Sequence, residues 1–264
     1  DGIGITKQDA KAVTNIGTWF RGSKITSFEE LRFFANVKEL HSEAFYQCRT
    51  LRSIDLSNVT KFHGWANFKD DTALEKVIVG DWEKISEYCF NNCKNAVFVG
   101  GLPRTIRTIE INGNFRNTKR LTGDVVLPYL QSKVTASCFE GSGLERVLDL
   151  GDITLIDGSA FNDCASLWLA ILPSTYNLSK WNAFRNTSLS VLICKATTPP
   201  TLNEGNNFTG TPLENGTGTI YVPDGSVEAY KTATNWSRMA NVIRPLSDFP
   251  TDNPSLYAEL EQYL

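Results

Sequence analysis

Histidine and methionine are scarce in this chain, whose 264 residues include two histidines and a single methionine. Histidine is the commonest general base and metal ligand, so its scarcity leaves few residues for either kind of chemistry. The sequence also lacks a glycine-rich phosphate loop after a strand, a G-x-S-x-G nucleophile motif and an H-E-x-x-H zinc motif. We therefore expect no enzyme activity, no cofactor and no bound metal.

A large net charge and long apolar runs are absent as well. The 26 basic and 29 acidic residues give a net charge of −3, which offers no electrostatic reason to expect nucleic acid as a partner. No apolar run reaches about 18 residues, so no transmembrane helix is expected. The chain begins with Asp1 and shows no signal peptide, so we expect that an export signal has been removed.

What the chain does contain is a repeat anchored on phenylalanine. The stretch AFYQCRTLRSIDL at 44–56 recurs as AFNDCASLWLAIL at 160–172, with cysteine three residues after phenylalanine and leucine six after it. Looser copies fill the intervals, and successive anchors are 22 to 25 residues apart. The anchors are Phe20, Phe45, Phe68, Phe90, Phe115, Phe139, Phe161 and Phe184. A period in the low twenties is typical of leucine-rich repeats.

Each copy is predicted to form one coil of a solenoid, because a single coil cannot bury its apolar residues alone. In SIDL at 53–56, Ile54 and Leu56 should point inward and Asp55 outward, since strand side chains alternate. Side chains from successive coils should then form ladders inside the stack. The predicted ladder residues are Phe45, Phe68, Phe90, Phe115, Phe139, Phe161, Phe184, Leu51, Leu74 and Leu167.

We expect an α/β repeat solenoid with short parallel strands and a helical cap at each end. Residues 1–18 should form the N-terminal cap, and 19–195 the solenoid of about eight repeats. Residues 196–246 should contain a loop, a final strand and the helical C-terminal cap, followed by a tail at 247–264.

The unit I-x-x-x-A-F-x-x-C-x-x-L-x-x-I-x-L resembles the BspA-type leucine-rich repeats of bacterial surface proteins. The resemblance covers about residues 15–246, in which 25–40 looks like a first repeat and 194–246 like a last strand and helical cap. It implies a right-handed superhelix in a secreted or surface-anchored protein of a host-associated bacterium. It also implies binding or adhesion rather than catalysis, and it specifies no ligand.

The six cysteines are predicted to be free thiols that fill small spaces. Cys48, Cys93 and Cys164 follow their phenylalanines by three residues, where other copies have Asp71 or Thr187. Neighbouring coils never both have cysteine at this position, so a disulfide between them is not expected. A C-x-x-x-C pair at 89–93 has no second pair to complete a zinc site.

Two further candidates are weaker. His41 and His63 lie ahead of successive anchors and could approach one another, but two imidazoles alone do not make a metal site. The segment 1–13 resembles the second half of a calcium-binding loop and its helix, in which Asp9 would be the last ligand. We favour a helical cap for this segment.

A solenoid offers a long surface for binding, and the outward strand positions are its predicted site. Ten residues after the anchors these positions hold Asp55, Ile78, Asp149 and Ile171. An apolar residue there can mark a recognition patch, although a loop or a further domain could equally cover it. Four tryptophans could stack on sugars or pack at the coil corners: Trp65, Trp82, Trp168 and Trp181.

Together these observations favour a monomeric adhesion protein, secreted or exposed at a cell surface, that binds a protein or glycan of a host or bacterial surface. The alternative is a glycan-binding accessory protein of a polysaccharide-uptake system.

Overall fold

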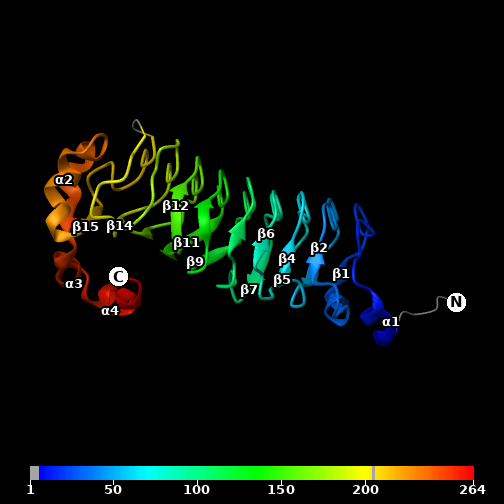
Figure 1. Ribbon diagram of the computed structural model, residues 1–264. Helices are drawn as coiled ribbons and strands as arrows, with labels where there is room; N and C mark the ends of the chain where they lie inside the picture. The colour runs from blue at the N-terminus through cyan, green and yellow to red at the C-terminus, as the bar shows by residue number, and fades with distance from the viewer. Residues whose placement is uncertain (1–5, 204–205) are drawn as a thin grey trace. The chain divides into compact units, whose positions relative to one another are not determined.

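The structure, a computed structural model, describes residues 6–203 and 206–264. The chain divides into two compact units, Asp1–Thr122 and Gly123–Leu264. Within each unit the backbone forms stacked coils whose strands pair in parallel (Figure 1). The predicted repeat solenoid is therefore confirmed.

The described residues of the first unit form two parallel sheets. One sheet has the order β1 (Ser27–Phe28), β3 (Ser53–Asp55), β5 (Lys76–Ile78) and β7 (Val97–Val99). The other has the order β2 (Glu39–Leu40), β4 (Lys61–Phe62), β6 (Lys84–Ile85) and β8 (Thr108–Ile109). Helix α1 (Lys7–Ala12) precedes the coils, and the 3-10 helix η1 (Glu29–Phe33) follows β1. The sequence pattern predicts the first sheet alone. The second forms because an apolar residue five or six positions before each anchor, namely Leu40, Phe62, Ile85 or Ile109, lies in a short strand of its own.

The second unit has one long and one short parallel sheet in its described part. The long sheet has the order β16 (Ile243–Pro245), β15 (Thr219–Val222), β14 (Val191–Cys194), β13 (Leu169–Leu172), β11 (Gly143–Asp149) and β9 (Thr122–Val126). The short sheet pairs β10 (Gln131–Val134) with β12 (Asp152–Ile156). Its helices are η2 (Asp224–Ser226), α2 (Val227–Thr232), η3 (Trp236–Val242), η4 (Leu246–Asp248), α3 (Phe249–Asp252), α4 (Pro254–Leu260) and η5 (Glu261–Tyr263).

Two left-handed backbone positions create the turn at the anchors from Phe45 to Phe184. The residues two before and two after each of these phenylalanines have positive φ, as at Glu43 (60°) and Gln47 (59°) around Phe45. Asparagine, aspartate or glycine fills most of the later position, because these residue types tolerate left-handed backbone best. The members of that later series are Gly22, Gln47, Asp70, Asn92, Asn117, Gly141, Asp163, Asn186 and Gly210. The periodic turn residues thus determine where each coil bends.

The phenylalanine ladder forms as predicted in both units. In the first, rings from Phe20 to Phe115 stack with centroids 4.9 to 5.7 Å apart and planes within 8° of parallel. In the second, the stack runs from Phe139 to Phe184 and then to Phe208, with 5.2 to 5.8 Å between centroids. Every predicted ladder phenylalanine and leucine has an exposed fraction of 0%. Phe208 lies within the stretch predicted as loop and extends the ladder by one coil.

The C-terminal cap covers the last coil of the second unit. Tyr230 of α2 and Trp236 of η3 are completely buried. The Tyr230 hydroxyl donates to the Ala196 carbonyl at 2.9 Å, and the Trp236 indole N–H donates to the Pro200 carbonyl at 2.9 Å. These bonds satisfy carbonyl groups that the end of a stack would otherwise leave unpaired.

Candidate interaction surfaces

The outward strand positions of the first unit are only partly open to solvent. Asp55 has an exposed fraction of 5%, contrary to the prediction that it faces solvent. Its Oδ1 accepts the Ser57 N–H at 3.0 Å, and its Oδ2 lies 3.9 Å from the guanidinium of Arg32 in η1. Ile78 is half-buried, and Val99, which pairs with it across β5 and β7, is 47% exposed. Asp55 therefore serves a local turn and ion pair.

In the second unit, the outward face of the long sheet is covered by the end of the chain. Ile171 is 2% exposed and belongs to a buried apolar cluster with Phe249 of α3 and Leu260 of α4. The other buried members of this cluster are Leu148, Leu169, Ile193 and Tyr221. Residues 246–264, here termed the C-terminal segment, thus fill the face on which Ile171 was predicted to bind a partner.

Polar contacts fasten the C-terminal segment to this sheet. The Tyr221 hydroxyl donates to Asp252 Oδ2 at 2.9 Å and accepts the Asn253 side-chain N–H at 2.9 Å. Arg146 of β11 forms a bidentate pair with Asp124 and also donates to Glu259 Oε1 at 2.6 Å. These carboxylates raise the pKa of the Arg146 guanidinium, so it stays charged.

The prediction for Asp149 fails because its repeat is one residue shorter. Leu144 follows Phe139 by five residues, whereas the leucine follows by six in the better copies. Val147 pairs with Ala170, so Leu148 is the outward counterpart of Ile171. Asp149 instead accepts the Gly151 N–H at 2.8 Å and shapes the turn after β11.

The four tryptophans lie in different environments. Trp82 is completely buried and contacts the phenylalanine ladder at Phe90, and Trp168 packs against the cluster under the C-terminal segment. Trp181 is 64% exposed. Trp65 is half-buried and has aromatic and basic neighbours. Only the last two are accessible to a ligand.

A row of aromatic and basic side chains crosses four successive coils of the first unit. The Arg21 guanidinium lies 5.6 Å from the Tyr46 ring centroid, and the Tyr46 and Trp65 centroids are 5.4 Å apart. The Lys69 ammonium lies 4.8 Å from the Trp65 centroid and 5.0 Å from that of Tyr88. These five residues are termed the aromatic–cation row. Arg21, Tyr46 and Lys69 each directly follow their anchors, whereas Trp65 and Tyr88 precede theirs by three and two residues, so the sequence period alone does not bring all five together.

The cysteines are buried and structural. All six are free thiols, as predicted. The thiols of Cys48, Cys93 and Cys164 donate to the carbonyl of the preceding coil's anchor at 2.8 to 3.0 Å. Burial raises the pKa of every one of these thiols, which opposes formation of the reactive thiolate.

The histidine and N-terminal candidates also take structural places. The His41 and His63 rings stack with centroids 5.6 Å apart, and no group of residues suited to a metal ion occurs in the described part of the chain. Asp9 accepts the Thr6 N–H at 3.0 Å in a capping box at the start of α1. The Thr6 hydroxyl, which donates to the same carboxylate at 2.6 Å, and then the Thr6 N–H lower the pKa of Asp9, and both bonds support the predicted helical cap. The remainder of the possible calcium loop, residues 1–5, lies outside the described residues.

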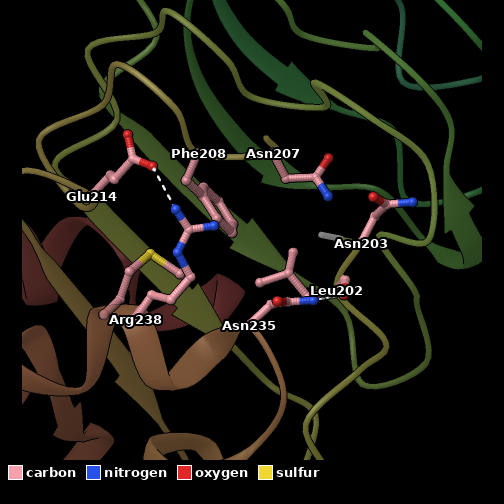
Figure 2. Close-up of a pocket in the computed structure, with 8 residues that line it drawn as sticks. Leu202, Asn203, Asn207, Phe208, Glu214, Asn235 and Arg238 are labelled. Carbon is pink, nitrogen blue, oxygen red and sulfur yellow. Dashed lines mark hydrogen bonds and ion pairs between the residues drawn. The ribbon is translucent and has the colours of Figure 1, made fainter. Parts of the chain in front are cut away.

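A pocket lies at the C-terminal end of the second unit, as Figure 2 shows. It is lined by Leu202, Asn203, Asn207, Phe208, Glu214, Asn235, Arg238 and Met239. Arg238 points toward Glu214 at 3.8 Å, and the Asn235 side chain donates to the Leu202 carbonyl at 2.8 Å. A cavity of about 20 Å³ has room for about one water molecule. We interpret this pocket as part of the cap.

Comparison with protein families identifies one match. The model for the BspA type leucine rich repeat region matches residues 10–97 and 83–200, with six copies of the repeat. No curated protein matches the chain. None of the described helices combines the length and the apolar character needed to cross a bilayer.

Proposed function

From the premise that the chain belongs to the BspA-type leucine-rich repeat family, we propose that it is a secreted or surface-exposed binding protein. The family often comprises surface and adhesion proteins. In this proposal the solenoid binds a macromolecule of a host or bacterial surface, acts as a monomer outside the cell and has no catalytic role.

The aromatic–cation row is the observation that best supports this proposal. Protein interfaces are enriched in tyrosine, tryptophan and arginine, and four of the five residues in the row are of these types. The long sheet of the second unit is a less suitable binding surface, because the C-terminal segment already covers its apolar face.

Binding can be tested with the purified chain on two panels, one of extracellular matrix proteins and one of surface glycans. We expect saturable binding to at least one member and weaker binding of Trp65→Ala. Absence of binding on both panels would contradict the proposal.

A role as a glycan-binding accessory protein of polysaccharide uptake is the second candidate, favoured by the half-buried aromatic rings of Trp65 and Tyr88. The two roles differ in the ligand required. An uptake protein should bind soluble polysaccharide and not matrix proteins, whereas an adhesin should bind to intact cells or to matrix.

A further inference from the structure

We propose that the aromatic–cation row is a binding site for an acidic glycan, a saccharide segment that carries carboxylate or sulfate groups. The inference rests on the proposed binding function and specifies its ligand. Arg21, Tyr46, Trp65, Lys69 and Tyr88 supply the two chemical features that such a ligand needs, which are flat rings and fixed positive charge.

Lys69 provides the positive charge. Its ammonium group lies over the rings of Trp65 and Tyr88, which come from adjacent coils. Aromatic rings attract a cation through their quadrupole but carry no net charge, so they hold the ammonium in place without neutralising it. In the described part of the chain Lys69 has no carboxylate within ion-pair distance. The held charge is therefore available to an anionic group of a ligand.

Arg21 provides a second cation at the other end of the row. Its guanidinium lies over Tyr46 and also 3.2 Å from Glu43 Oε2. The arginine is exposed, and an exposed ion pair contributes little free energy. A ligand carboxylate or sulfate can therefore compete with Glu43 for the guanidinium, whose fork of donors matches both groups.

The rings provide the stacking surface. Tyr46, Trp65 and Tyr88 are half-buried, so one part of each ring is anchored and another faces solvent. The negative face of an aromatic ring attracts the positively polarised C–H groups of a sugar ring. Successive coils are about 4.8 Å apart, which spaces the rings in a row suited to an extended chain.

The backbone beneath Tyr88 is shaped for this ring. A Cβ atom at Gly113 in the next coil would lie 2.7 Å from the Tyr88 ring, so only glycine lets the ring lie against the backbone there.

The row is not a general requirement of coil corners. Trp181 of the second unit stands three residues before its anchor, as Trp65 does, and is 64% exposed. In the described part of the chain Trp181 has no aromatic or basic side chain stacked on it. Trp181 therefore serves as a matched control for an isolated surface tryptophan.

The site can be tested by titrating the full chain with heparin, hyaluronan and neutral dextran in an isothermal calorimeter. We expect binding to at least one acidic polysaccharide, none to dextran, and weaker binding as salt rises from low to high ionic strength. Lys69→Gln and Trp65→Ala should each weaken binding by roughly 10-fold or more, as expected for loss of a charge-assisted contact. Trp181→Ala should bind as the unchanged chain does.

Several results would overturn the inference. They are absence of binding to both acidic polysaccharides, equal losses for Trp65→Ala and Trp181→Ala, or equal affinity for poly-glutamate or single-stranded DNA. If the chain binds a matrix protein and neither polysaccharide, the proposed function stands and this site assignment fails. Circular dichroism of each variant separates a binding defect from unfolding, and Lys69→Gln alters no buried residue.

Discussion

Replacing Asp71 with threonine should stabilise the protein at neutral pH. Asp71 occupies the position three residues after Phe68, where other coils have cysteine or threonine. Its carboxyl group is completely buried and neither oxygen has a hydrogen-bond partner. Desolvation by burial raises the pKa of Asp71 from 3.8 to about 9. The folded protein must therefore keep a proton on this carboxyl that the unfolded chain releases.

The size of the effect follows from the difference between the two pKa values. In the unfolded chain Asp71 is ionised at pH 7, because this pH is about 3 units above its ordinary pKa. Keeping the carboxyl protonated in the folded protein at pH 7 therefore lowers stability by about 4 kcal/mol. The folded-state pKa lies above the unfolded-state value. The loss is therefore absent below about pH 4, grows as the pH rises and levels off above about pH 9.

Threonine suits this position because another coil of the same unit already uses it. Thr118 Oγ1 donates to the carbonyl of Phe90, the anchor of the preceding coil, at 3.0 Å. At position 71 the equivalent acceptor is the Phe45 carbonyl, so Asp71→Thr should remove the proton uptake and add a hydrogen bond.

Urea unfolding at pH 4, 6 and 8, followed by circular dichroism, measures the effect. We expect Asp71→Thr to raise the free energy of unfolding by several kcal/mol at pH 8 and little at pH 4. The reciprocal Thr118→Asp should lower stability and introduce the same dependence on pH. An identical pH dependence for Asp71→Thr and the unchanged chain would refute the argument that a protonated, buried Asp71 opposes folding.

Three other predictions concern the thiols, the ladder and the C-terminal segment. Thiol titration should detect close to six reactive groups in denatured protein without reductant and almost none in native protein, because all six are buried; fewer than about four in denatured protein would indicate disulfides. Phe90→Ala removes a ring stacked on both neighbours and should lower the free energy of unfolding by about 3–5 kcal/mol, and a loss under about 1 kcal/mol would contradict the ladder. Phe249→Asp should detach the C-terminal segment and increase binding of an apolar dye through exposed Leu148 and Ile171, whereas unchanged dye fluorescence would show that this segment does not cover the sheet.

The parts of the fold that repeat could be predicted from the sequence. The anchoring phenylalanines, the leucines that follow them and the buried cysteines recur at nearly fixed spacings, because equivalent positions of each coil pack against the neighbouring coils in the same way. The turn geometry has a nearly as periodic signal, the asparagine, aspartate or glycine two residues after most anchors.

The parts that occur once could not be found in this way. The repeat has one residue fewer between Phe139 and Leu144, which places the side chains of β11 on the opposite face from the one predicted. Asp149 therefore leaves the predicted outward position. The C-terminal segment also lies outside the repeat. The only sequence signal for its docking is the presence of apolar residues on both faces of β13 and β14, a pattern typical of strands covered on both sides.

The candidate site illustrates the same limit at the surface. Trp65 is recognisable in the sequence as a possible sugar contact, but its partners Tyr46, Lys69 and Tyr88 become neighbours only when the coils stack. Tyr46 and Lys69 are one repeat period apart, but Trp65 and Tyr88 stand at other offsets from their anchors, so the repeat pattern alone does not group them.

The contact between the C-terminal segment and β11 changes how the second unit should unfold. A stack of coils is a nearly one-dimensional array, in which an end coil can fray while the others persist. The bond from Arg146 to Glu259 joins residues 113 positions apart, and the C-terminal segment contacts strands β11, β13, β14 and β15. An end coil of this unit cannot separate without breaking that contact. The C-terminal segment therefore couples these coils into one cooperative unfolding step, which protects the terminal strands from local opening.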